Sequence, residues 1–178
     1  MEQGDADVTG LDDLVVAAEG WLVDDESELG PVDVGQTLRH YVGIWSREWT
    51  PATEAEPSVV WVEGETSRVT GRVGSSVGVF DGFDILCGPA RFWMFTGAYD
   101  LGPPLGYVPP ITEPPHGSWV TVEGRLYVRP WYEVTDGAGM SERDMETEAG
   151  WPTSCDWVVR SVADGSHSWV LHLAARPR

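Results

Sequence analysis

The chain has 178 residues, of which 42% are apolar, and it carries 29 acidic against 11 basic side chains for a formal net charge of −18. This size suits one compact domain that buries about two-thirds of its unfolded surface without a metal or a disulfide. The acidic excess disfavours nucleic-acid and membrane binding, because phosphate backbones and anionic lipids repel it, and favours a basic partner, a cation or simple solubility.

Targeting and redox features predict a cytoplasmic protein. The first residues, Met1–Asp7, are acidic and contain no apolar stretch of the kind found in signal peptides. No apolar run approaches the ~20 residues that a membrane-spanning helix needs. The two cysteines, Cys87 and Cys155, lack a CxxC spacing, so we expect reduced thiols, and a disulfide between them stays an open alternative.

In the first third of the chain, alternating apolar residues predict strands. The acidic segment 1–13 is expected to fray, and a first strand follows over 14–23. After the solvated acidic loop Asp24–Glu28, residues 36–49 are read as a strand rather than a short helix, because they are rich in aromatic and β-branched side chains. Residues 50–57 have the composition of a linker.

The middle of the chain reads as a hairpin. A short strand over 59–62 precedes a long strand over 67–80 that three glycines interrupt. The dipeptide Asp81-Gly82 is a strong turn signal and predicts that 83–87 pairs back on the long strand. The almost wholly apolar segment 90–96 predicts a further strand.

The last part of the chain begins with a proline-rich connection over 97–117, which is incompatible with helix or central strand and is expected to be a structureless loop. Regular alternation predicts a strand over 118–132, with Arg125, Tyr127 and Arg129 pointing outward. The polar segment 136–150 is a short helix or an insertion, and 157–162 with 167–173 form a closing hairpin.

One short pattern, apolar-x-Gly-x-apolar, occurs three times, at Ala18–Leu22, Val69–Val73 and Val122–Leu126. A glycine inside a strand normally weakens it. Glycines that recur at the same place in the alternation therefore indicate bends or bulges at the corners of a small closed barrel.

These elements predict a mainly-β fold, a small Greek-key barrel that is OB-like or SH3-like, with little helix. In the OB-like assignment, 67–80 is the first strand, 83–95 gives the next two, 118–132 is the fourth and 157–173 closes the barrel. We expect one domain over 14–178, with 14–57 and 58–175 as an alternative division.

Catalytic and metal signatures are weak. There is no G-x-S-x-G motif. Cys87 reads as a packed thiol, and Asp156 beside Cys155 would raise the pKa of that thiol. His167 and His172 lie on opposite faces of a strand, and the acidic run 24–28 lacks the calcium-loop spacing. We therefore assign no catalytic, metal or cofactor residue and favour a protein that is not an enzyme.

The leading hypothesis is a non-enzymatic β-barrel protein that acts through protein–protein contact, as an acidic inhibitor or immunity-type protein or as an assembly component. Its partner would be basic, and the oligomeric state is left open. The candidate partner-binding residues are the acidic and aromatic side chains Asp24, Asp25, Glu26, Glu28, Trp119, Tyr127 and Trp131.

Two alternatives remain. The first is an OB-like binder of single-stranded nucleic acid that uses Arg72, Arg125 and Arg129 beside exposed aromatics. The second is a small-molecule binder or enzyme with a site under the loop Gly97–Gly117, lined by Trp93, Tyr99 and Tyr107.

Overall fold

The chain folds almost wholly into β-strands. The computed structural model describes residues 8–23, 29–74, 81–129, 155–164 and 168–177. Within these ranges the helical element is one short 3-10 turn, η1 (Gly20–Leu22). The strands in chain order are β1 (Leu14–Glu19), β2 (Thr37–Leu38), β3 (Val42–Trp45), β4 (Thr50–Pro51), β5 (Ser58–Glu63), β6 (Thr66–Gly74), β7 (Gly82–Cys87), β8 (Ala90–Phe95), β9 (Tyr99–Asp100), β10 (Tyr107–Val108), β11 (Trp119–Val128), β12 (Cys155–Asp164) and β13 (Ser168–Pro177).

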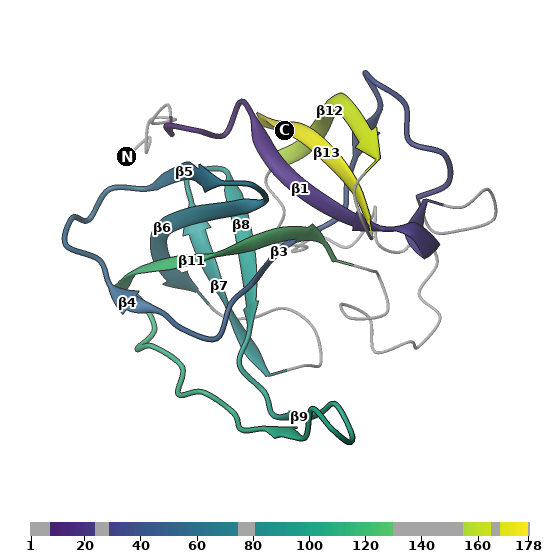
Figure 1. Cartoon of the computed structure of the whole chain (residues 1–178). Coiled ribbons are helices and arrows are strands. Elements are labelled where there is room, and N and C mark those ends of the chain that lie inside the picture. The colour runs from purple at the N-terminus through teal and green to yellow at the C-terminus, as the bar shows by residue number, and fades with distance from the viewer. Residues whose placement is uncertain (1–7, 24–28, 75–80, 130–154, 165–167, 178) are drawn as a thin grey trace, which may run out of the picture.

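Five of these strands close into a barrel (Figure 1). β6, β7 and β8 form an antiparallel meander. β8 lies parallel to β3, and β3 runs antiparallel to β11. The ring closes where β11 pairs antiparallel with β6, from Trp119 opposite Arg72 to Arg125 opposite Thr66. The predicted mainly-β small barrel with little helix is confirmed.

The strand that completes the ring is not the predicted one. The OB-like assignment used 157–173 as the closing strand, but β3, which precedes the other four strands in the chain, fills the place between β8 and β11. β3 has only four residues, and its alternation is too short to mark a barrel strand in the sequence. Its buried Val42 and Ile44 nevertheless supply the apolar face that closes the core.

The predicted closing hairpin instead belongs to a second layer. β12 and β13 form the long hairpin that the sequence predicts, with a register shift between Val159 and Ser161. β13 pairs with β1, and β12 pairs with β2. β1 joins this layer to the barrel, because it lies parallel to the end of β11, with Val16 opposite Leu126.

Two of the three recurrent glycines lie where long strands change partners. Gly71 stands between Thr70, which pairs with β5, and Arg72, which pairs with β7. A Cβ atom there would lie 2.5 Å from the carbonyl oxygen of Leu86. A Cβ at Gly124 would lie 2.3 Å from the carbonyl oxygen of Trp45. These two glycines thus permit close approaches of the backbone, whereas Gly20 lies in η1 and a Cβ there would meet nothing within 4 Å.

One core fills the barrel and the space beneath the second layer. The buried apolar side chains form a single cluster that includes Val69, Ile85 and Leu126 of the barrel and Leu171 of β13. Phe92 of β8 contacts Trp157 of β12, with ring centroids 6.0 Å apart. Among the described residues, no helix combines the length and the apolar character that crossing a membrane would require.

Candidate functional site

An aromatic row runs along the outer face of the barrel. Phe92 and Met94 of β8 face the core, so the alternation turns Trp93 and Phe95 outward. The ring centroids of Trp93 and Phe95 are 5.8 Å apart, and those of Phe95 and Tyr99 are 6.0 Å apart. Tyr99 in turn contacts Trp45 of β3 at 5.8 Å. The planes are tilted by 45–48°, an arrangement that ring quadrupoles favour over a face-to-face sandwich.

Two arginines stack on this row, each on a different ring. The Arg129 guanidinium carbon lies 3.5 Å from the centroid of the Trp93 ring, and the Arg129 side chain is wholly buried. The Arg47 guanidinium carbon lies 5.2 Å from the centroid of the Tyr99 ring. Both distances allow attraction between the cation and the negative face of the ring.

Arg47 also holds the two ends of the hairpin β9–β10. Its Nη1 donates to the carbonyl oxygen of Gly97 at 3.3 Å, and its Nη2 donates to the carbonyl oxygen of Pro109. Gly97 precedes β9 and Pro109 follows β10. One guanidinium therefore fixes the base of the hairpin and packs against Tyr99, its first residue.

The rest of the proline-rich connection is tied down as well. Trp49 Nε1 donates to the carbonyl oxygen of Thr112 at 2.8 Å. The backbone N–H of Ile111 donates to the carbonyl oxygen of Thr96 at 2.9 Å, and the Thr96 hydroxyl donates to Glu113 at 2.8 Å. The expectation of a structureless loop over 97–117 is wrong. Side chains of residues 47–49 donate hydrogen bonds to backbone carbonyls of this segment, which the prolines leave without partners in a strand ladder.

The hairpin carries unusually exposed apolar side chains. Leu105 is 71% exposed, Tyr107 65% and Leu101 53%, and Trp45, at the hairpin base, is 50% exposed. Figure 1 shows β9 at the edge of the molecule, away from the second layer. We call these four side chains the hairpin surface.

A buried carboxyl lies near the other end of the aromatic row. Asp84 of β7 is opposite Trp93 of β8 and is wholly buried. Burial raises the pKa of Asp84 to about 6, although Arg91 and Arg129 oppose this shift. Arg91 Nη1 lies 3.5 Å from Asp84 Oδ2, while Oδ1 has no hydrogen-bond partner. The carboxyl is therefore a costly buried group that the neighbouring arginines only partly compensate.

The structure describes two of the predicted partner-binding residues, Trp119 and Tyr127. The four acidic candidates Asp24, Asp25, Glu26 and Glu28, together with Trp131, fall outside the described residues. Trp119 and Tyr127 are half-buried near opposite ends of β11. Trp119 lies opposite Arg72 on the neighbouring strand β6. The Tyr127 ring covers Gly43 of β3, where a Cβ atom would lie 2.5 Å from the ring.

The predicted arginine face is largely engaged within the chain. Arg129, which was predicted to point outward, is buried, because its guanidinium stacks on Trp93. Arg125 Nε pairs with Glu65 at 2.6 Å, and its Nη2 bonds to the Ser168 hydroxyl. Arg72 is exposed beside Trp119. Such internal ion pairs reduce the positive charge that the face could present to phosphate.

The residues proposed to line a site under the loop lie along the aromatic row and on both faces of the hairpin. Phe95 connects Trp93 to Tyr99, but Arg129 covers the Trp93 ring. Tyr107 is opposite Asp100, while Tyr99 is opposite Val108. Tyr99 and Tyr107 therefore point to opposite faces of the two-stranded sheet.

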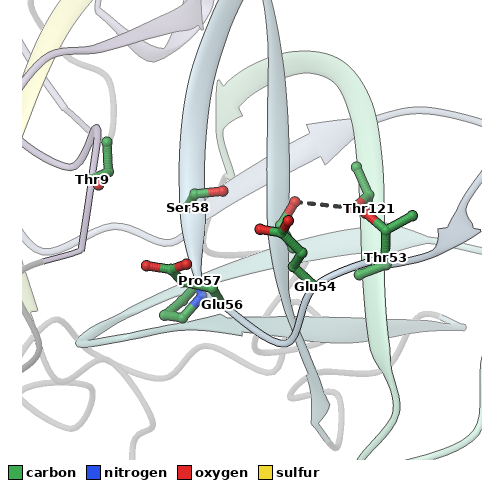
Figure 2. Close-up of a pocket in the computed structure, with 9 residues that line it drawn as sticks. Thr9, Thr53, Glu54, Glu56, Pro57, Ser58 and Thr121 are labelled. Atoms are coloured by element: carbon green, nitrogen blue, oxygen red, sulfur yellow. Dashed lines mark hydrogen bonds between the residues drawn. The ribbon is translucent and has the colours of Figure 1, made fainter.

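An open pocket of about 280 Å³ lies elsewhere, beside β5, β6 and β11. Figure 2 shows Thr9 on one side, across from Thr53 and Thr121. The hydroxyls of Thr70 and Thr121 are 3.0 Å apart. The lining residues are Thr9, Ala52, Thr53, Glu54, Glu56, Pro57, Ser58, Thr70 and Thr121. The pocket is polar and shares no residue with the aromatic row.

Both cysteines are buried. Cys87 and Cys155 do not form a disulfide with each other. Burial raises the pKa of the Cys87 thiol to about 12, so it stays protonated and a poor nucleophile near neutral pH. In the part of the chain that the structure describes, no group of three or more His, Cys, Asp or Glu side chains is arranged to hold a metal ion.

Sequence reasoning missed the residues that form the hairpin surface. It singled out Tyr107 for a pocket but passed over Trp45, Leu101 and Leu105. The available signal was that Leu101 and Leu105 stand among prolines and glycines, in a segment with no core-facing alternation. Comparison of the chain with protein-family models, curated proteins and solved structures finds no match.

Proposed function

We propose that this protein binds another protein through the hairpin surface. The observation that carries the proposal is the solvent exposure of Leu101, Leu105 and Tyr107 within one short hairpin, with Trp45 at its base. Grouped exposed apolar side chains on a protein mark interaction sites more often than scattered ones do. Trp and Tyr are also the residues most enriched where binding energy concentrates.

The way the hairpin is held supports the same function. The Leu101 N–H donates to the carbonyl oxygen of Gly106 at 3.0 Å, and the Gly102 N–H donates to Asp100 Oδ1 at 2.8 Å. Arg47 fixes the hairpin base. A loop that is ordered before binding loses less conformational entropy when its partner arrives. These contacts therefore favour a preformed docking element.

The charge of the chain favours a basic partner. A formal net charge of −18 would steer a positively charged protein toward this one and raise the association rate at low salt. An inhibitor, an immunity-type protein or an assembly component would each use a surface of this kind without catalysis. The nucleic-acid alternative has less support, because Arg129 is buried and Arg125 is paired with Glu65.

The test compares captured proteins between matched variants. Tagged wild-type protein, the double variant L105S/Y107S and the control V34S are each used for affinity capture from the native cells. Val34 is 67% exposed but lies far along the chain from the hairpin. We expect one protein that the wild type and V34S capture and L105S/Y107S loses. If L105S/Y107S captures the same proteins as the wild type, the proposed function is wrong.

A further inference from the structure

We propose that the exposed face of Trp45 receives an arginine side chain of the basic partner, with Glu48 and Asp81 as the carboxylates near the aromatic row. This inference rests on the proposed function and specifies the chemistry of the ligand. It concerns the outer end of the aromatic row, where Trp45 contacts Tyr99 at 5.8 Å.

The chain already uses this row to stack guanidinium groups. Arg129 lies 3.5 Å from the centroid of Trp93, and Arg47 lies 5.2 Å from the centroid of Tyr99. Trp45 extends the same row and is half-exposed. Because Trp is the aromatic side chain that attracts cations most strongly, its exposed face is a further place for a guanidinium from outside the chain.

The charges beside the row suit a cation. Glu48 is exposed and follows Trp45 by three residues in the chain. Asp81 is exposed near Phe95, since a Cβ at Gly97 would contact both the Phe95 ring and Asp81 Cβ. The Arg47 guanidinium is directed at two backbone carbonyls, which leaves its charge partly screened from a second cation.

Arginine fits this arrangement better than lysine does. A guanidinium is planar, stacks flat on a ring and keeps donors at its edge for nearby carboxylates. An ammonium is strongly hydrated and gives up more water when it lies against an aromatic face. The surface should therefore distinguish between two peptides of equal charge.

The test measures peptide affinities by calorimetry at low salt. The probes are a synthetic peptide of alternating Gly and Arg and a matched peptide of alternating Gly and Lys. The proteins are the wild type, W45L and the control W61L, which removes a Trp that is 58% exposed on β5. Leu at position 45 keeps an apolar side chain but lacks the aromatic face. Circular dichroism and thermal melting of each variant establish that it is folded.

We expect the Arg peptide to bind the wild type and W61L more tightly than the Lys peptide does, and to bind W45L roughly 3- to 30-fold more weakly. The inference is overturned if the peptides bind the wild type equally, if W45L and W61L weaken binding by the same factor, or if neither peptide binds. The proposed function is judged separately: if L105S/Y107S loses its partner while W45L does not distinguish the peptides, the docking surface stands and the arginine site is wrong.

Discussion

Arg47 lies against Tyr99, with its guanidinium carbon 5.2 Å from the ring centroid, while its two terminal nitrogens donate to Gly97 and Pro109. A single side chain thus connects the loop after β3 to both ends of the hairpin β9–β10. The consequence is a hairpin whose apolar side chains are exposed but whose backbone is held in place.

Replacing Arg47 with alanine should loosen the hairpin while leaving the barrel intact. The variant loses two hydrogen bonds and one ring contact, at a cost of about 1–3 kcal/mol in the local free energy of opening. Amide hydrogen exchange should therefore accelerate at Leu101 and Gly106, both of which are bonded within the hairpin. Exchange in β6 and β11 should change little.

The matched control for this prediction is R72A, which removes an exposed arginine from β6. It should leave exchange in the hairpin unchanged. Equal acceleration in R47A and R72A, or no acceleration in R47A, would show that Arg47 does not hold the hairpin.

Asp84 should make stability depend on pH between about 4 and 6. Its pKa is raised from 3.8 to about 6 in the folded protein, so the folded state binds more protons than the unfolded state in this window. Stability from this group is present below pH 4 and is lost as the pH rises through 6. The loss amounts to about 3 kcal/mol, from 1.36 kcal/mol per unit of pKa shift.

The measurement is urea unfolding of the wild type and D84N at several pH values. Because asparagine does not titrate, the difference in unfolding free energy between the two proteins should change across this window and be constant above pH 7. A difference that is independent of pH from 3 to 8 would contradict a raised pKa at Asp84. Comparing the two proteins cancels the titration of the other carboxylates.

Removing Arg91 should raise the pKa of Asp84 further. Arg91 is the largest influence that lowers this pKa, and its side chain is 29% exposed, so R91Q is a tolerable change. The pH window of the preceding prediction should then move upward, because the carboxylate has lost an attracting cation. Observation of the Asp84 carboxyl carbon by NMR reports this pKa directly, and a pKa that falls in R91Q would exclude the assigned ion pair.

The glycines of the recurrent pattern should differ in their tolerance of alanine. G71A and G124A place a methyl group against backbone carbonyl oxygens of Leu86 and Trp45, which should cost about 1–3 kcal/mol in unfolding free energy. G20A meets nothing within 4 Å and should change stability by less than about 0.5 kcal/mol. Thermal or urea unfolding ranks the three variants by stability. A G20A variant as unstable as the other two would contradict the conclusion that Gly71 and Gly124 are required for close approach of another backbone.

Strands with a long alternation of apolar and polar residues can be predicted from the sequence more readily than strands whose position depends on the strands they pair with. β6 and β11 could be predicted because nine or ten consecutive residues alternate. Gly71 and Gly124 were read as bends or bulges, and the structure shows them where another backbone comes close. β3 could not be placed, because its four residues fit several positions and only the parallel pairing with β8 selects one. Long-range pairing of this kind has no local signal.

The candidate site was harder to predict for the same reason. The alternation correctly predicted that Arg129 lies on the outer face of its strand. It did not predict that the Arg129 side chain is buried, because this burial depends on Trp93 from another strand. Proline content excluded helix and central strand from 97–117, but it gave no sign of the hairpin β9–β10 or that Arg47 and Trp49 would order this segment. The exposed hairpin surface became visible only once the core had been assigned.

The central claim is that the hairpin surface contacts a protein partner, and site-specific photo-crosslinking tests it most directly. A photoreactive amino acid is placed at position 105 of the hairpin or at position 34, both of which are strongly exposed, and the native cells are irradiated. The account predicts one crosslinked protein species from position 105 that is absent from position 34. Crosslinking to the same species from both positions, or none from position 105, would contradict it.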